Sequence, residues 1–216
     1  MSTVPLDDCL EYVMPEVPGC PRTLVKREVR EAAISLCQSS GIWREEMIKL
    51  GILEGIAIYE VDIPRDSKLV QVLSVRISDR NVIAKTSDWL DKHDSTDWRD
   101  LEGAARYYMM STPVEMLLNR KPKESVEAAL TATLSLKPSR SADTIPEFLY
   151  EDWINVIASG AKSKLMMIPN KTWSAPDHSA AESYEFKKGK GRAKTEANKG
   201  HSVVDLRVSR RRITSR

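Results

Sequence analysis

The residues from Val126 to Leu136 alternate between apolar and mostly polar side chains without a break. Successive side chains of an extended strand leave opposite faces of a sheet, so the alternation predicts a β-strand with one dry and one largely wet face. Lys137-Pro138-Ser139 ends this strand. The predicted dry face holds Val126, Ala128, Leu130, Ala132, Leu134 and Leu136, and the wet face holds Glu127, Ala129, Thr131, Thr133, Ser135 and Lys137.

A long helix is predicted after this strand, from Ile145 to Met167. Thr144 and Glu147 have the spacing of a capping box, and Pro146 falls in the first turn, where its missing N–H costs little. Gly160 interrupts the apolar stripe at a cost of about 1 kcal/mol relative to alanine, which indicates close packing of the backbone. Trp153, Ile157 and Gly160 are therefore predicted to be structural core, on an inward stripe completed by Tyr150, Ile154, Ala161 and Leu165.

Weaker patterns predict the remaining elements. A short helix over 4–13 begins at Pro5, and a second over 22–39 ends before Gly41, a residue suited to the position after a helix. A final helix from Asp177 to about Lys199 is predicted to have Ala181, Tyr184 and Lys188 on one side. The segment 87–103 is predicted to be an irregular excursion. Short apolar runs between turn residues predict antiparallel hairpin strands over 46–53, 56–62, 69–77, 81–85, 105–110 and 114–119.

These elements together predict an α+β fold of 216 residues, enough for one core or for two small modules that share one. Residues 1–43 and 141–200 supply N-terminal and C-terminal helices to a helical bundle. Residues 44–140 form an antiparallel, sandwich-like β module. Residues 201–216 form an extended basic C-terminal tail.

No apolar run approaches the roughly 20 residues that a membrane-spanning helix needs, and the first residues lack the pattern of a signal peptide. We therefore expect a globular protein that makes no membrane contact and is not secreted by that route. Cys9, Cys20 and Cys37 have spacings unlike those of a zinc site, and reduced thiols in the cytoplasm are the expected state.

Candidate chemistry is weak along the chain. His93 lies between Asp91 and Asp94, but no second histidine or cysteine accompanies it, so a polar loop is the better interpretation than a metal or acid–base site. Gly189-Lys190-Gly191 lacks the strand and the remaining residues of a phosphate-binding loop. Trp89 and Trp98 have Asp-rich neighbours, which favours packing or an interface over base stacking. We predict no enzyme, no catalytic residue, no metal and no cofactor.

Charge is distributed unevenly. Residues 187–216 contain 11 basic and two acidic residues, a net charge of +9, which leaves −7 on residues 1–186 from the total of +2. Val204, Leu206 and Val208 alternate with Asp205 and Arg207, so the tail can add as a strand to a sheet edge on a partner. The predicted docking residues are Val204, Leu206, Arg207, Val208, Arg210, Arg211 and Arg212, with nucleic-acid contact and a solvated tail as the alternatives.

Several of these features resemble the head-to-tail adaptor, or connector, proteins of tailed bacteriophages. The helical start ends in Ser40-Gly41-Ile42-Trp43, a strand runs from Gly55 to Pro64, and the long strand closes in Leu136-Lys137-Pro138-Ser139. The C-terminal part is the most similar: a helix entered through Pro, with a Gly-Ala pair, that ends before a Trp-containing loop. The matching positions there are Ile145 to Tyr150, Trp153, Ile157, Gly160, Ala161, Leu165, Pro169, Trp173 and Phe186.

This resemblance implies a structural virion protein, assembled in the host cytoplasm and placed in the neck of the particle. Many copies, typically twelve, would form a ring that binds the portal protein on one side and the tail tube or nozzle on the other. DNA would pass through the channel without specific binding, which suits an acidic body because like charges repel. The basic tail would then lie away from the channel and dock on the portal.

Two rival functions stay open. A tail terminator or tail-completion ring protein would associate with the tail tube in the absence of the portal. A DNA-binding protein would use the last helix and the basic C-terminus, and its affinity for duplex DNA would fall steeply with salt.

Overall fold

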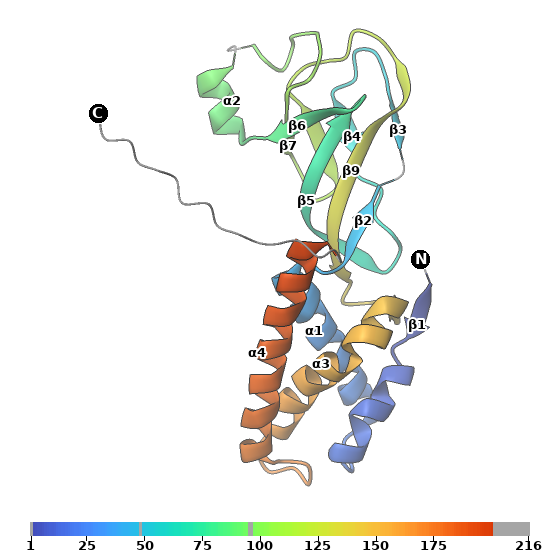
Figure 1. The fold of residues 1–216 in the computed structure, drawn as a ribbon, viewed down its shortest axis with the longest axis vertical. Coiled ribbons are helices and arrows are strands. Elements are labelled where there is room, and N and C mark those ends of the chain that lie inside the picture. Colours follow the sequence, from blue (N-terminus) through green and yellow to red (C-terminus); the bar gives the residue numbers. More distant parts are fainter. Residues whose placement is uncertain (1, 48, 95–96, 201–216) are drawn as a thin grey trace, which may run out of the picture.

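The computed structural model describes residues 2–47, 49–94 and 97–200. It confirms the α+β class and has a helical bundle at one end and a curled β module at the other (Figure 1). The predicted tail residues 201–216 lie outside the described residues.

Helices α1 (Arg22–Ser40), α3 (Glu147–Met166) and α4 (Pro176–Lys199) pack together as the bundle (Figure 1). α1 ends as its sequence predicts, because Gly41 adopts a left-handed backbone with φ 63° and its N–H donates to the Cys37 carbonyl. Beside the bundle lie the short 3-10 helices η1 (Asp8–Tyr12) and η2 (Met14–Glu16) and the paired strands β1 (Thr3–Pro5) and β10 (Thr144–Pro146).

The β module inserts between α1 and α3, and its strands follow the order β2-β9-β5-β6-β7-β8-β4, with β3 also paired to β9. The pairings are antiparallel as predicted, except that β6 and β7 pair in parallel across the excursion that contains α2 (Ser87–His93). The strands are β2 (Arg44–Glu46), β3 (Leu50–Ile52), β4 (Ile58–Glu60), β5 (Ser67–Ile77), β6 (Arg80–Ala84), β7 (Tyr107–Met110), β8 (Glu115–Leu118) and β9 (Val126–Pro138).

The predicted alternation on β9 holds from Leu130 to Leu134 and fails at both ends. Ala128 has φ 48° and is exposed, while Ala129 is buried, so an irregular backbone shifts the faces of the first residues. Ser135, predicted to be wet, is fully buried because this end of β9 lies against the end of α1, where Gly41 approaches its hydroxyl.

Two predictions for helix starts are wrong. The predicted helix over 4–13 is replaced by β1 and η1, because the backbone of Thr3–Pro5 pairs with β10. The predicted capping box at Thr144 does not form, since Thr144 belongs to β10 and the N-cap of α3 is Pro146. In both cases pairing between distant segments overrides the local signal.

The buried face of α4 is not the side that the sequence singles out. Ala181, Tyr184 and Lys188, predicted to share one side, are all exposed, Tyr184 to 66%. The buried side consists mostly of small residues, which a hydropathy pattern does not reveal: Ser179, Phe186, Gly189, Ala193 and Ala197.

Glycines let α3 and α4 approach closely. A Cβ on Gly160 of α3 would lie 2.8 Å from the ring of Phe186 in α4 and 2.9 Å from Ala32 Cβ in α1. On α4, Gly189 faces Val156 of α3 in the same way. Each helix therefore places a large side chain over a glycine of the other, which explains why glycine is needed inside these helices.

Candidate interaction surfaces

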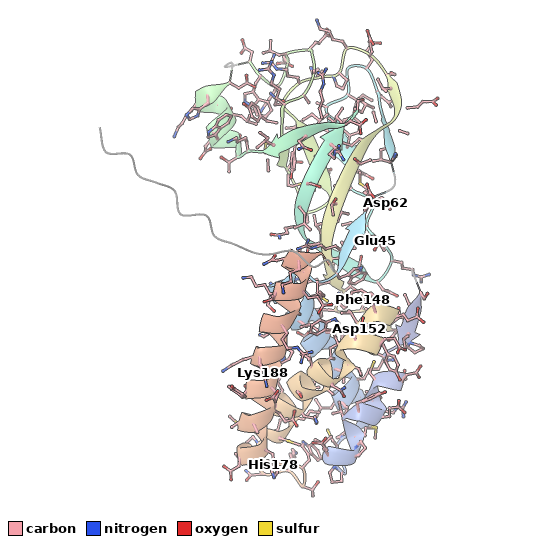
Figure 2. The ribbon with its side chains drawn as sticks, viewed as in Figure 1. Glu45, Asp62, Phe148, Asp152, His178 and Lys188 are labelled. Carbon is pink, nitrogen blue, oxygen red and sulfur yellow. The ribbon has the colours of Figure 1, made fainter. Side chains whose placement is uncertain are left out.

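The outer face of α4 is strongly basic. Residues 184–199 contain six basic and two acidic residues, a net charge of +4. The ammonium group of Lys190 lies 4.8 Å from the ring centre of Phe186, whereas Lys187, Lys188 and Lys194 are exposed. Lys188 is labelled on the side of α4 that faces away from the bundle (Figure 2). This basic face ends at Gly200, where the bundle meets the β module (Figure 1).

A groove of about 620 Å³ lies beside this face, between the end of α3 and the start of α4. Two large apolar side chains on its walls are mostly exposed, Met167 at 64% and Tyr184 at 66%. Lys164 and Lys187 also line it, so the groove combines apolar area with positive charge. Such a combination suits an apolar side chain flanked by carboxylates.

A second, oppositely charged surface forms where η1 meets the first turns of α3. The Tyr150 hydroxyl donates to the Glu11 carboxylate at 3.2 Å, and the rings of Tyr12 and Tyr150 meet edge-on at 5.9 Å. We call this surface the acidic face. Its exposed carboxylates, none of which has an ion pair within the described residues, are Asp8, Glu11, Glu147, Glu151 and Asp152.

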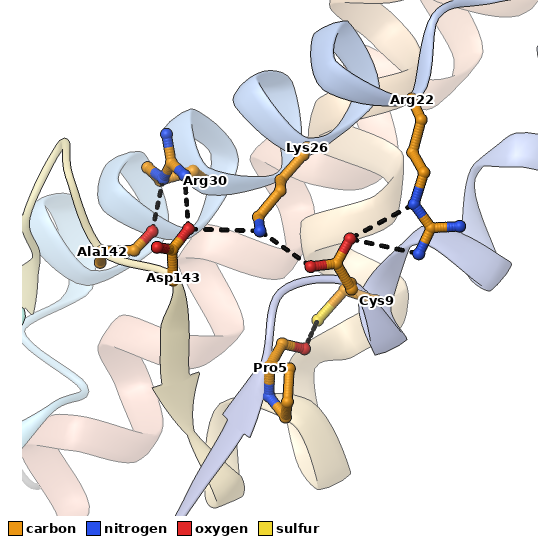
Figure 3. A network of polar contacts seen from close by, with 8 residues as sticks. Pro5, Cys9, Arg22, Lys26, Arg30, Ala142 and Asp143 are labelled. Atoms are coloured by element: carbon orange, nitrogen blue, oxygen red, sulfur yellow. Dashed lines mark hydrogen bonds and ion pairs between the residues drawn. The ribbon is translucent and has the colours of Figure 1, made fainter.

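A network of ion pairs fixes η1 against α1 (Figure 3). Asp7 accepts hydrogen bonds from Lys26 at 2.8 Å and from Arg22 at 3.2 Å, and these bonds hold the pKa of Asp7 below its ordinary value. Lys26 also pairs with Asp143 at 3.2 Å, which ties in the residue before β10. The segment that carries Asp8 and Glu11 is therefore held in place.

Lys162 on α3 makes a second tie. It is only 8% exposed and pairs with Glu16, the last residue of η2, at 2.8 Å and with Glu182 on α4 at 3.0 Å. Burial alone would lower the pKa of Lys162, but the hydrogen bonds to the two carboxylates outweigh it, so its pKa is raised.

A hollow of about 810 Å³ runs along α1 at the junction with the β module. Four basic side chains line it, Lys68, Lys137, Arg140 and Lys164. Three of these already have partners: Lys137 donates to Gln38, Arg140 pairs with Glu31, and Lys164 pairs with Glu28. Two of the four positive charges in this hollow, those of Arg140 and Lys164, are thus paired with carboxylates within the chain.

The far end of the β module carries an apolar hollow of about 220 Å³. Ile52, Ile77, Leu118 and Val126 contribute to its walls, and Val126 is 43% exposed. Leu53, Ile56 and Ile58 in the neighbouring turn and strand are also largely exposed. This end therefore presents apolar surface to a partner.

The predicted excursion around α2 is an ordered polar cluster. Trp98 is fully buried and its indole N–H donates to Asp91 at 2.7 Å, and this bond, with Arg99, lowers the pKa of Asp91. His93 is exposed, and its ring stacks on Trp89 at 4.8 Å. Both tryptophans thus make packing contacts within the chain.

The remaining chemical candidates have structural surroundings. Within residues 2–47, 49–94 and 97–200, no cluster of histidine, cysteine, aspartate or glutamate could hold a metal ion. Cys9, Cys20 and Cys37 are free and buried, and burial raises the pKa of Cys9 and Cys37 to about 12, so little thiolate forms at neutral pH. No helix of the described residues is long and apolar enough to cross a membrane.

No protein-family model matches this chain, and no curated protein matches it either. The predicted docking residues Val204, Leu206, Arg207, Val208 and Arg210 to Arg212 lie outside the described residues. Trp153 is 2% exposed and Ile157 is fully buried, both in the bundle beside Gly160.

Sequence reasoning missed the acidic face because it joins segments more than a hundred residues apart. One signal was available: neither 1–21 nor 141–161 contains a lysine or an arginine, although each contains four carboxylates. The adjacency of the two segments is a tertiary fact that spacing along the chain does not encode.

Proposed function

We propose that this chain is the adaptor of a tailed bacteriophage, a structural protein whose ring connects the portal to the tail. Its place is the neck of the virion, after assembly in the host cytoplasm. In this role copies of the chain contact one another, the portal protein and the tail tube or nozzle, and DNA passes through the ring.

The architecture is the observation that carries the proposal. N-terminal and C-terminal segments fold together in one bundle, a β module is inserted between them, and the chain leaves α4 for its basic tail at the junction of the two. The resemblance of the sequence to adaptor proteins implies a helical bundle combined with a β module, and terminal segments that reach neighbouring subunits or the portal. The two ends of the molecule offer separate surfaces, and the β-module end carries the exposed apolar residues Leu53, Ile56 and Ile58.

The charge distribution supports passage of DNA. Residues 1–186 carry a net charge of −7, so most of the body repels phosphate, and the basic residues are concentrated from Lys187 onward. In the proposed arrangement α4 and the tail face protein partners, and acidic surface outside the contacts between subunits faces the channel.

Light scattering of the purified chain, alone and mixed with the portal ring of the same genome, tests the proposal. A discrete larger complex that carries a whole ring of copies is the expected result. If the chain and the portal ring elute separately at all concentrations, the adaptor function is wrong.

Truncation after Gly200 tests the role assigned to the tail. Among the described residues the core ends at Ala197, so we expect the truncated chain to keep its thermal unfolding midpoint and to bind the portal more weakly. Two full-length variants separate the contribution of the apolar tail residues to portal binding from that of the arginines. Leu206→Asp with Val208→Asp removes the apolar alternation, and Arg210→Ala with Arg211→Ala and Arg212→Ala removes charge. Full portal affinity in the truncated chain would exclude tail docking.

The basic face of α4 specifically favours one alternative, a DNA-binding protein, because exposed Lys187, Lys188 and Lys194 lie on one helix that leads into an arginine-rich tail. This alternative predicts binding to duplex DNA whose affinity falls linearly, on logarithmic axes, with salt concentration. Fluorescence anisotropy with a labelled duplex at several salt concentrations measures it. Binding that is weak at physiological salt argues for the adaptor.

A further inference from the structure

The bundle carries surfaces of opposite charge on different sides of one molecule. In Figure 1, α4 forms one edge of the bundle and β1 and η1 form the other, with α1 and α3 between them. The basic face and groove lie along α4, whereas the acidic face lies over η1 and the start of α3. Because both surfaces belong to a rigid bundle, one copy cannot satisfy its own acidic face with its own α4.

We infer that the partner of the α4 surface is a second copy of this chain, docked through its acidic face. The inference deepens the proposed function, on which it rests, by assigning the surfaces through which neighbouring subunits of the ring meet. Contact between two different surfaces is heterologous and repeats from copy to copy, so it generates closed rings or open filaments rather than a two-fold dimer.

Charge complementarity selects this partner. Asp8, Glu147, Glu151 and Asp152 have no ion pair within the described ranges, and neither do Lys187 and Lys194 on the outer face of α4. Opposed surfaces of this kind steer association and fix its register, and they reject pairing of like surfaces. The same complementarity disfavours contacts between two acidic faces or between two α4 faces.

Apolar side chains occur on both surfaces as well. The α3–α4 groove exposes Met167 and Tyr184 between Lys164 and Lys187. On the acidic face, Tyr12 is 37% exposed, follows the exposed Glu11 and meets the ring of Tyr150 edge-on. A tyrosine beside a carboxylate matches an apolar groove that carries lysines, and aromatic residues are enriched at the centres of protein interfaces.

Mixing two charge-reversed variants tests the inference. The first carries Asp8→Lys, Glu151→Lys and Asp152→Lys, and the second carries Lys187→Glu, Lys188→Glu and Lys194→Glu. Each is expected to be folded by circular dichroism and monomeric by light scattering, under conditions in which the unmodified chain associates. A 1:1 mixture is expected to regain the mass of the unmodified assembly, because every interface in an alternating ring again joins opposite charges.

A matched control separates the position of the charges from their number. Glu54→Lys, Asp62→Lys and Asp88→Lys change the same three charges on exposed residues of the β module and α2. This control is expected to associate alone, as the unmodified chain does. Mixed with the second variant it is expected to form no alternating assembly, because its own acidic face still repels the reversed α4 of that variant. Association of the unmodified chain is also expected to weaken as salt is raised, since exposed charges are screened over about 8 Å at physiological ionic strength.

Several outcomes would overturn the inference. These are an unmodified chain that stays monomeric up to high concentration, a charge-reversed variant that assembles alone, or a mixture that stays monomeric. The measurement omits the portal, so its failure is separate from failure of the proposed function: portal binding without rescue in the mixture excludes only the assigned surfaces. Rescue without any binding to the portal leaves the surfaces in place and excludes the adaptor.

Discussion

Gly189 and Gly191 lie two residues apart on α4 and differ in what surrounds them. A Cβ on Gly189 would collide with Val156 of α3, whose own Cβ lies 3.1 Å away. Alanine favours a helix by about 1 kcal/mol over glycine, but overpacking a well-packed contact typically costs 1–3 kcal/mol. We therefore expect Gly189→Ala to lower the free energy of unfolding by roughly 1 kcal/mol, measured by urea denaturation.

Gly191 is the matched control for that substitution. A Cβ there would meet no atom of the described residues within 4 Å, and the residue is exposed. Gly191→Ala is thus expected to raise the free energy of unfolding by up to about 1 kcal/mol. Equal effects of the two substitutions would show that Gly189 serves no packing role.

The contribution of Lys162 to the stability of the chain is expected to depend on pH. Its pKa is raised in the folded chain by Glu16 and Glu182, so its stabilising contribution is complete below the unfolded pKa of about 10.4 and is lost as pH rises through the folded pKa. Lys162→Met is expected to lower the free energy of unfolding by roughly 1–2 kcal/mol at pH 7. This is less than the loss of a fully buried ion pair would cost, because the Glu16 side chain is 52% exposed. Urea denaturation at pH 7 and pH 11 compares the two chains. A difference that does not shrink at pH 11 would contradict the assignment.

At the scale of the elements, the useful contrast is between two threonines at helix starts. Thr86 caps α2, since its side chain accepts a hydrogen bond from the Trp89 N–H, whereas Thr144 lies in β10 before α3. Loss of a threonine cap costs about 1 kcal/mol. We expect Thr86→Ala to speed amide exchange in α2 by roughly fivefold, which corresponds to that energy, and Thr144→Ala to leave exchange in α3 nearly unchanged. Faster exchange in α3 of the Thr144→Ala chain would show that Thr144 does cap α3, as the sequence predicts.

The elements that could be predicted are those whose signal is local. The Gly41 stop of α1, the apolar stripe of α3 and the β5–β6 hairpin follow from residue types within a few positions of each other. The predictions fail where a distant segment determines the local structure. Thr3–Pro5 pairs with β10, which contains Thr144, and α4 packs on α3 through small residues and not through Tyr184. The faces of β9 fail at Ala128, because alanine gives no hint of a positive φ.

The candidate surfaces were predictable only in part. The basic character of the C-terminal third is plain in the sequence, and so are acidic stretches near Asp8 and Glu151. That η1 packs on α3, and that α4 turns its lysines outward while burying glycines, depends on the packing of the bundle. The sequence therefore indicates which segments are acidic or basic, and only the fold shows which of them lie together on one surface.

At the scale of the whole molecule, the bundle and the β module share a continuous core. The buried cluster runs from Leu165 and Trp153 in α3, through Trp43 at the junction, to Leu134 and Val75 in the sheet. The chain crosses between the two parts at Ile42-Trp43 and again after Pro138, and the Leu136 N–H donates to the Trp43 carbonyl. Such continuity favours cooperative unfolding of both parts together.

Trp153→Ala tests this cooperativity. Trp153 is 2% exposed under α4, where Arg192 lies 5.7 Å from the centre of its ring, so truncation is expected to cost roughly 3–5 kcal/mol. If the core is one unit, the opening free energies of β9 and β5 amides fall by the same amount as those of α1 amides, measured by native-state hydrogen exchange. Trp89→Ala, at a half-buried residue on α2, is the control and should affect mainly the exchange of amides near α2. Unchanged exchange in β9 of the Trp153→Ala chain would instead mean that the β module folds independently, and that a perturbation of the bundle does not reach the far end of the sheet.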